Sequence, residues 1–320
     1  MYMSCKLRPC YKEYLWGGQR LKKDFHKTDA PAVTAESWEL AQHPDGLSVV
    51  AEGEYAGRTL GELGALDHDA FWGRKCPAER FPLLVKLIDA DKDLSIQVHP
   101  SDESADPALG EEGKAELWYV VDCEPGGALY LGFSQPIGRE EFERRAADGS
   151  ICQVLNRVNI ARGDVFYVKP GTIHAICRGT LIAEIQQNSN TTFRVFDYQR
   201  LGADGKPRAL HLERAAGVVS YQPIIPQECH ANNSLQCKDF TLREMFSCAY
   251  FKTYCLDVRA SVGLFCDGDS FQHLLCVEGD GFIRCEGRIY PFARGESFFL
   301  PAAMGEYKIF GTCRILISRL

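Results

Sequence analysis

A short pattern occurs twice in this chain. Residues 161–170 read ARGDVFYVKP and residues 293–301 read ARGESFFLP, so each copy has a glycine–acid turn, an apolar segment and a closing proline. Residues 116–121 and 272–277 form a second, weaker pair. Repetition at this scale indicates that two related structural units follow one another. Because the repeated segments have the composition of strands, we predict an all-β fold with two jelly-roll units in tandem.

Short β-type segments dominate the rest of the chain. Turn-forming residues separate seven of them, at residues 81–87, 94–99, 117–121, 128–133, 165–168, 181–186 and 192–196. Residues 138–147, and more weakly residues 59–66, have helical character. Residues 221–239 carry prolines and asparagines without a clear period, and we interpret them as a linker. We therefore predict a catalytic domain with helical insertions over residues 1–235 and a degenerate β domain over residues 236–320.

Composition narrows the class of protein. A net charge of -7 over 320 residues argues against a general binder of nucleic acid or of anionic membranes. The N-terminal residues lack the apolar core of a signal peptide, and no apolar run approaches a membrane span. The 14 cysteines include no CxxC pair, and many lie inside apolar segments, as reduced thiols in a core do. We expect a cytoplasmic protein that is a monomer or a weak homodimer.

Four residues of the first unit are candidate ligands of a divalent metal ion. In the alternating segment 94–99, Gln97 and His99 point to one face of the expected strand, about 6–7 Å apart along it. Glu116 follows, and His174 comes after a Pro–Gly turn. Each residue alone is more often a surface group, but a small barrel can bring all four to one interior. A zinc ion held by them keeps a net charge of about +1 and is a strong Lewis acid.

The second unit lacks equivalent ligands. When the repeats are aligned, Gln272 takes the place of Glu116, and Gly305 falls about where His174 would be. We therefore expect one metal ion per chain and a structural role for the C-terminal unit.

Seven motifs point to one family. They are WGG at 16–18, ESWE at 36–39, LVKL at 84–87, QVHP at 97–100, GKAE at 113–116, PGTIH at 170–174 and TFRVFDY at 192–198. In this order they resemble the short bacterial class of type I mannose-6-phosphate isomerase, a family of the cupin superfamily, over nearly the whole chain. The fold implied is therefore a tandem cupin with a few short helices.

The resemblance also implies a site. Zinc would be bound by Gln97, His99, Glu116 and His174, with functional roles for Lys114 and Arg194. Ala115 stands where relatives often have threonine or proline, and it is expected to face away from the ligands. Trp16 and Glu39 resemble positions that line the sugar pocket, with a core or lid role as the alternative for Trp16.

The implied reaction interconverts mannose 6-phosphate and fructose 6-phosphate through an enediolate, for which a general base moves a proton between C2 and C1. The base candidates are Glu184, Lys114, a displaced His99 and a zinc-bound water, and the sequence does not choose among them. Arg194 and Lys86 are the best cationic anchors for the phosphate. Arg194 could instead assist ring opening or stabilise the enediolate.

Two other functions fit the same residues less well. An iron-dependent cupin oxygenase would more often use two histidines and one carboxylate, without the glutamine. A sugar-phosphate sensor could keep the ligands and lack turnover. For the isomerase we expect a small sugar phosphate as the partner, and neither nucleic acid nor a membrane.

Overall fold

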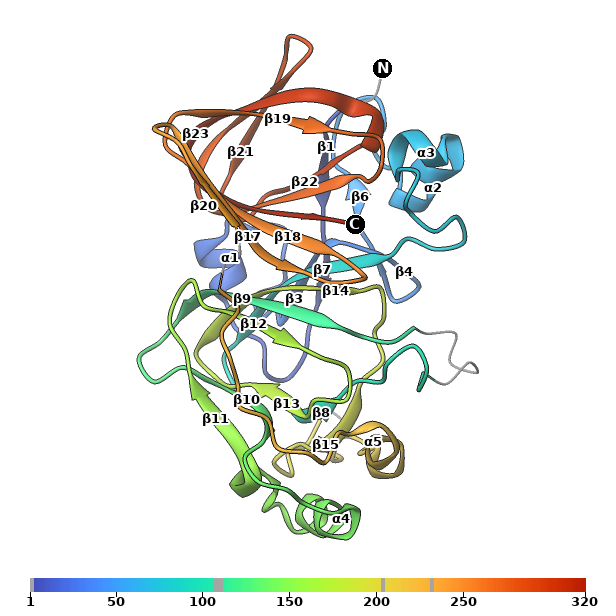
Figure 1. Cartoon of the computed structure of the whole chain (residues 1–320), viewed down its shortest axis with the longest axis vertical. Helices are drawn as coiled ribbons and strands as arrows, with labels where there is room; N and C mark the ends of the chain where they lie inside the picture. Colours follow the sequence, from blue (N-terminus) through green and yellow to red (C-terminus); the bar gives the residue numbers. More distant parts are fainter. Residues whose placement is uncertain (1–2, 106–111, 203–204, 231–232) are drawn as a thin grey trace.

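The computed structural model describes residues 3–105, 112–202, 205–230 and 233–320. Strands dominate it, and they form two stacked halves, with the C-terminal strands and the first strand of the chain in one half and the strands of residues 96–196 in the other (Figure 1). No helix within these residues is long and apolar enough to cross a membrane. Because strands dominate the described residues and the helices are short, the predicted all-β fold is confirmed.

Two antiparallel sheets build the N-terminal half. The six-stranded sheet runs in the order β12 (Val165–Val168), β9 (Glu116–Cys123), β14 (Thr180–Gln187), β7 (Leu83–Ala90), β3 (Glu36–Leu40) and β2 (Cys10–Lys12). The five-stranded sheet runs in the order β11 (Leu155–Asn159), β10 (Ala128–Phe133), β13 (His174–Ile176), β8 (Ile96–Val98) and β15 (Phe193–Phe196). Apolar residues of both sheets pack together, among them Ile88 and Ile182 from the first and Leu129 and Ile176 from the second. The two sheets therefore face each other across one interior.

A ten-stranded sheet builds the C-terminal half. Its main path runs through β16 (Asn233–Gln236), β17 (Phe240–Ser247), β18 (Lys252–Val258), β23 (Gly305–Arg319), β20 (Gln272–Cys285), β22 (Ser297–Leu300), β1 (Cys5–Arg8) and β6 (Val49–Val50). Strand β19 (Ser261–Cys266) pairs with β23, and β21 (Arg288–Ala293) pairs with β20. Because β1 and β6 come from the N-terminal end of the chain, this sheet crosses the predicted boundary at residue 235. The division into two domains stays a prediction.

The strand register supports the internal repeat. Strand β12 pairs with β9 so that Val168 lies opposite Glu116, and β22 pairs with β20 so that Leu300 lies opposite Gln272. Both polar residues thus start equivalent strands. In the C-terminal half the amide of Gln272 accepts a 2.5 Å hydrogen bond from the Tyr307 hydroxyl and donates one to the Phe265 carbonyl. Gln272 is therefore used in internal hydrogen bonds.

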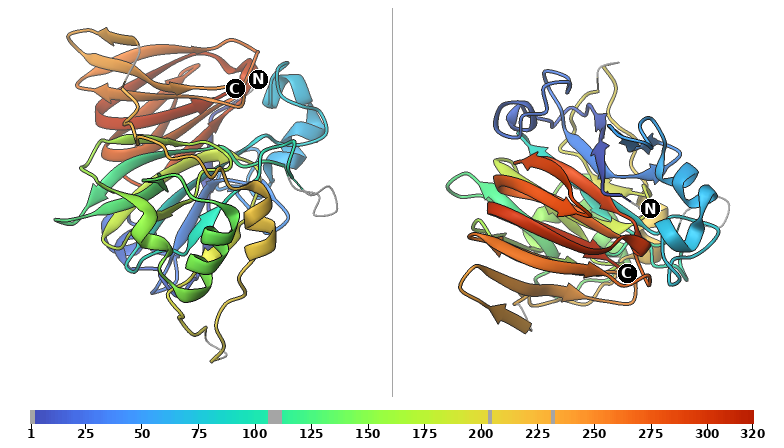
Figure 2. Two further views of the ribbon diagram at one scale, coloured as in Figure 1. Left: turned by 60° about the horizontal axis from the view of Figure 1, so that its bottom comes forward. Right: turned by 90° about the horizontal axis from the view of Figure 1, so that it is seen from above.

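The helices are short and peripheral. They are α1 (Arg20–Asp24), α2 (Leu60–Leu66), α3 (His68–Phe71), α4 (Arg139–Asp148) and α5 (Leu212–Val218). Thr59 and Glu62 form a capping box that starts α2, and Gly149, with φ 80°, ends α4. Figures 1 and 2 place α2 and α3 beside the C-terminal strands and α4 and α5 at the opposite end. Short hairpin strands β4 (Gln42–His43) and β5 (Gly46–Leu47) complete the fold.

Most of the predicted elements are present. All seven β-type segments are strands and both helical segments are helices, with ends that move by at most three residues. The predicted linker is partly wrong, because residues 221–239 contain the edge strand β16. All four residues of β16 are exposed, so the strand lacks the apolar alternation by which strands are recognised.

The six-stranded sheet separates the site from the core between the halves. On one face, Val85, Leu117 and Ile185 pack with Phe271 and Phe299 of the C-terminal half. Since side chains alternate along a strand, the other face carries Lys86, Glu116, Trp118 and Glu184. This polar face looks into the interior between the two N-terminal sheets.

Candidate metal centre and adjoining cavity

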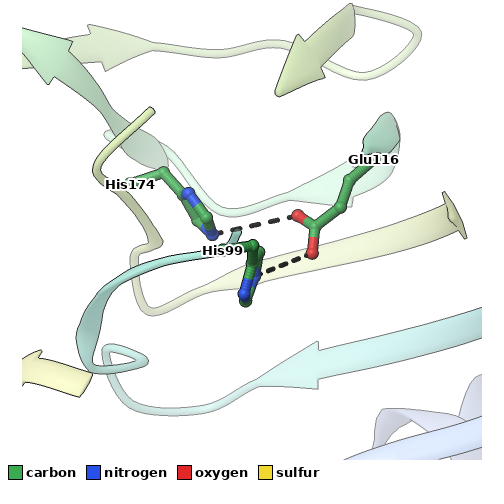
Figure 3. Close-up of side chains that lie close together, drawn as sticks. All are labelled: His99, Glu116 and His174. Atoms are coloured by element: carbon green, nitrogen blue, oxygen red, sulfur yellow. Dashed lines mark ion pairs between the residues drawn. The ribbon is translucent and has the colours of Figure 1, made fainter. Parts of the chain in front are cut away.

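Three predicted ligands converge in the N-terminal half (Figure 3). Glu116 starts β9, His174 starts β13 and His99 directly follows β8, so the facing sheets bring them together. All three are at most 1% exposed, and their ligand atoms lie within 4.8 Å of one another. Nε2 of His99 lies 2.9 Å from one Glu116 oxygen, and Nε2 of His174 lies 3.8 Å from the other.

The polar atoms of this group suit a metal ion. Among the described residues, Nε2 of both histidines and both oxygens of Glu116 are buried without a hydrogen-bond partner. The short His99–Glu116 contact is close in distance but lacks hydrogen-bond geometry. Leaving such atoms unpaired costs about 1–3 kcal/mol each, a cost that a bound cation would remove. Nδ1 of His174 lies 2.8 Å from the Thr172 carbonyl and can donate to it, which would leave the Nε2 lone pair free for a metal.

The protonation states also fit. Burial lowers the pKa of His99 to about 3 and lowers the pKa of His174, so both rings are neutral near pH 7. Burial raises the pKa of Glu116, but the Lys114 ammonium and then His99 outweigh it and hold that pKa well below its ordinary value. Two neutral imidazoles and one carboxylate form a donor set that zinc commonly takes.

Gln97 lies next to this group. On β8 it stands opposite His174 of β13 on one side and opposite Arg194 of β15 on the other. Residues directly opposite one another in paired strands share a face of the sheet. The register therefore puts Gln97 between a candidate ligand and a candidate substrate-binding residue.

A cavity of about 260 Å³ adjoins the three ligands. Its lining includes Gln97 and five of the other predicted site residues, namely Trp16, Lys86, Lys114, Glu184 and Arg194. Lys114 links the cavity to the ligands, because its Nζ lies 3.1 Å from Glu116 Oε1. Such a volume is slightly below the usual range for small-molecule sites, as expected for a compact substrate.

Lys86 lies between two carboxylates. Its Nζ is 3.1 Å from Glu184 and 3.7 Å from Glu36, and Trp118 Nε1 donates a 2.9 Å hydrogen bond to the other Glu184 oxygen. Burial lowers the pKa of Lys86, but Glu36 and Glu184 outweigh it and raise that pKa overall. The charge of Lys86 is thus already compensated, which argues against the predicted phosphate contact and for a role in holding Glu184.

Glu39 lies outside the cavity, so its predicted place in the sugar pocket is corrected. Its carboxylate forms a buried ion pair with Lys27 at 2.7 Å and accepts hydrogen bonds from Ser37 and from Ser297 of β22. Glu36 lines the cavity in its place. The two glutamates are three residues apart on one strand and therefore face opposite ways.

An arginine cluster adjoins the cavity, and of its three members only Arg194 was predicted from the sequence. Arg208 lines the cavity, and Asp197 accepts hydrogen bonds from Arg208 at 2.6 and 2.8 Å and from Arg200 at 2.5 Å. Arg194 donates to the Ala209 carbonyl, and its Nε is buried without a partner within the described chain. Three guanidinium groups and one carboxylate leave two positive charges in excess. No local motif distinguishes Arg208 from a surface arginine, so no signal in the sequence could have found it.

Comparisons with known proteins identify the family. A model for the catalytic domain of type I phosphomannose isomerase matches residues 4–121, and one for the cupin domain of mannose-6-phosphate isomerase matches residues 241–320. Mannose-6-phosphate isomerase ManA of Bacillus subtilis is 38% identical over 314 residues, which are 98% of each chain. The chain belongs to the type I phosphomannose isomerase family.

Further relatives and solved structures agree with this assignment. Mannose-6-phosphate isomerase of Streptococcus mutans is 34% identical over 95% of this chain and 94% of its own. The crystal structure of the Bacillus subtilis mannose 6-phosphate isomerase superposes with a TM-score of 0.92 at 35% identity, over 99% of each chain. A more distant structure, that of a "putative mannosephosphate isomerase from Archaeoglobus fulgidus", shows the same fold, with a TM-score of 0.76 at 23% identity. The predicted family and its cupin fold are thus confirmed.

Proposed function

We propose that this protein interconverts mannose 6-phosphate and fructose 6-phosphate with one bound zinc ion. One observation carries the proposal: a single cavity joins a buried metal-type donor set, through Lys114, to an arginine cluster. The names of the relatives supply the substrate, and the cavity offers both a Lewis-acid position and an anion position.

The metal ion would be held by His99, Glu116 and His174, with Gln97 as the fourth ligand. Bound there, zinc would supply a Lewis acid for the carbonyl and C2 oxygens of the sugar. One ion per chain is expected, because the described residues contain one group of three such ligands and Gln272 is engaged in hydrogen bonds.

Arg194 and Arg208 would bind the phosphate. Their side of the cavity has the excess positive charge, and a guanidinium group suits bidentate contact with phosphate oxygens. Lys86 takes a different role from the one predicted, since Glu36 and Glu184 already compensate its charge.

Glu184 is the leading candidate for the base that moves the proton between C2 and C1. It lines the cavity, and burial, with the charge of Glu116 next, raises its pKa even though Lys86 lowers it. A raised pKa brings a carboxylate closer to the pH at which general-base catalysis is efficient. Lys114 also lines the cavity and stays the second candidate. His99 is a poor base, because burial lowers its pKa to about 3.

The test combines metal analysis with isomerisation of mannose 6-phosphate in D₂O. We expect about one zinc per chain, turnover, and partial incorporation of deuterium at the carbon that receives the proton. Glu184→Gln should abolish both turnover and exchange, while Glu143→Gln on the exposed face of α4 should change neither. Turnover without any label after many reversible cycles would exclude the enediolate path.

An isomerisation assay without oxygen and the exchange experiment in D₂O separate the alternative functions. An iron-dependent oxygenase would need O₂, so isomerisation without oxygen excludes it. A sensor would bind the sugar phosphate without exchange of the C2 proton.

A cytoplasmic location, a monomeric or weakly dimeric state and the division into domains at residues 1–235 and 236–320 remain predictions.

A further inference from the structure

A pair of hydrogen bonds holds the backbone between Lys114 and Glu116. The residue between them is Ala115, whose N–H donates to Gln187 Oε1 at 2.9 Å. Its carbonyl accepts from the backbone N–H of Gln187 at 3.2 Å. Gln187 is the last residue of β14 and is 4% exposed. One buried glutamine therefore fixes the peptide that joins a metal-ligand candidate to a lysine of the cavity.

Asp102 fixes the orientation of Gln187 in turn. Its Oδ1 accepts hydrogen bonds from Gln187 Nε2 at 3.1 Å and from the Gly113 N–H at 2.8 Å. Because Nε2 faces Asp102, the amide oxygen of Gln187 is the atom that faces Ala115. The Lys114 N–H also donates to the Pro100 carbonyl at 3.0 Å. The segment that follows His99 is thus joined directly to Gly113 and Lys114, and through Gln187 it is joined to Ala115.

The chain of hydrogen bonds continues into the C-terminal half. Tyr250 lies in the turn between β17 and β18, and its hydroxyl donates to Asp102 Oδ2 at 2.8 Å. Tyr250, Asp102 and Gln187 border a surface cavity of about 580 Å³ that lies apart from the substrate cavity. The C-terminal hairpin therefore reaches the metal-bearing strand through two side chains.

We infer that Gln187 is a positioning residue for Lys114 and Glu116, and that Asp102 and Tyr250 make the C-terminal hairpin part of the same support. The inference rests on the proposed function for the role of Lys114 and Glu116. Supporting contacts behind a metal ligand commonly affect affinity or rate by 10–100-fold. Small displacements of catalytic groups are equally costly. A C-terminal unit without ligands of its own thereby acquires a role in the site.

The test uses Gln187→Met in the full-length protein. We expect the Kd for Zn²⁺, measured by competition with a chelator, to rise by about 10-fold. With zinc saturating, kcat should fall by about 10-fold while KM stays within twofold. The matched control is Gln42→Met, which removes a similar 2.8 Å bond from a backbone N–H, that of Gly61, and neither of these two residues lines the substrate cavity. A change in folding stability alone would lower the unfolding temperature of either variant without altering kcat of the folded enzyme.

A second variant tests the other end of this chain of hydrogen bonds, at Tyr250 in the C-terminal hairpin. Tyr250→Phe should lower kcat by about two- to threefold, and Tyr254→Phe, on the adjacent strand β18, should not. Adding Tyr250→Phe to Gln187→Met should have no further effect, because both break the same chain of bonds. Wild-type Kd and kcat in Gln187→Met, or fully additive losses in the double variant, would overturn the inference. If the wild type failed to isomerise mannose 6-phosphate, the proposed function would fall, while the Zn²⁺ Kd would still test the positioning role.

Discussion

Replacing Glu39 by glutamine should lower the stability of the fold and leave substrate binding unchanged. The Glu39 carboxylate lies 2.7 and 2.9 Å from the Lys27 ammonium, and Lys27 is only 7% exposed. Ser37 and Ser297 donate to the same carboxylate, so it also links β3 to β22 of the C-terminal half. Glu39→Gln keeps the shape and removes the charge that compensates Lys27.

The expected loss follows from the burial of the pair. Removing one partner of a buried ion pair costs about 3–5 kcal/mol, and the lower value applies because glutamine can still accept a hydrogen bond. Unfolding entropy of roughly 2.1 cal/mol/K per residue gives about 0.7 kcal/mol/K for 320 residues. A loss of about 3 kcal/mol then lowers the Tm by about 4–5 °C.

The assay pairs thermal unfolding, followed by circular dichroism at fixed zinc, with steady-state kinetics at 25 °C. Glu39→Gln should unfold earlier with KM and kcat unchanged, whereas Glu36→Gln, on the cavity side, should lower kcat/KM. A double variant, Lys27→Met with Glu39→Leu, should recover most of the stability, because no unpaired charge stays buried. A wild-type Tm together with a raised KM in Glu39→Gln would refute the assignment and return Glu39 to the sugar pocket.

Three further outcomes are expected. His174→Ala should lose most of its metal by elemental analysis and its isomerase activity with it, and two tightly bound ions in the wild type would contradict the single site. Arg194→Ala should keep zinc while kcat/KM falls by about 100-fold, as loss of a charge-assisted contact of about 3 kcal/mol implies; zinc loss or normal turnover would contradict its role. Burial lowers the pKa of His273 to about 3, so below pH 6.5 the unfolded chain takes up a proton that the folded chain does not. Between pH 7.5 and pH 5, the free energy of unfolding of the wild type should therefore fall by about 2 kcal/mol more than that of His273→Phe, as measured by denaturant titration. Equal falls in the two proteins would contradict this.

The sequence determined the parts of this protein that depend on local pattern. Strand β10 and strand β12 begin and end at the predicted residues, because short runs of β-forming residues and the turn residues that flank them are local signals. The repeat predicted the equivalent register of β9 and β20, since related units form the same pairing. The motifs around His99, Glu116 and His174 predicted their convergence, because they resemble those of one family and a small barrel brings such strands to one interior.

Only the tertiary structure decided which polar residues share the cavity. Glu36 and Glu39 lie on one strand, and which of them faces the cavity depends on the pairing of Trp38 with Lys86 and on a bulge before Leu40. Arg208 meets Asp197, 11 residues earlier, through the path of the loop between β15 and α5, and the Tyr250–Asp102–Gln187 chain joins segments far apart in sequence, so no local spacing reveals either. Contacts of this kind arise when facing sheets bury polar groups that must then find partners, and that choice is made by packing in three dimensions.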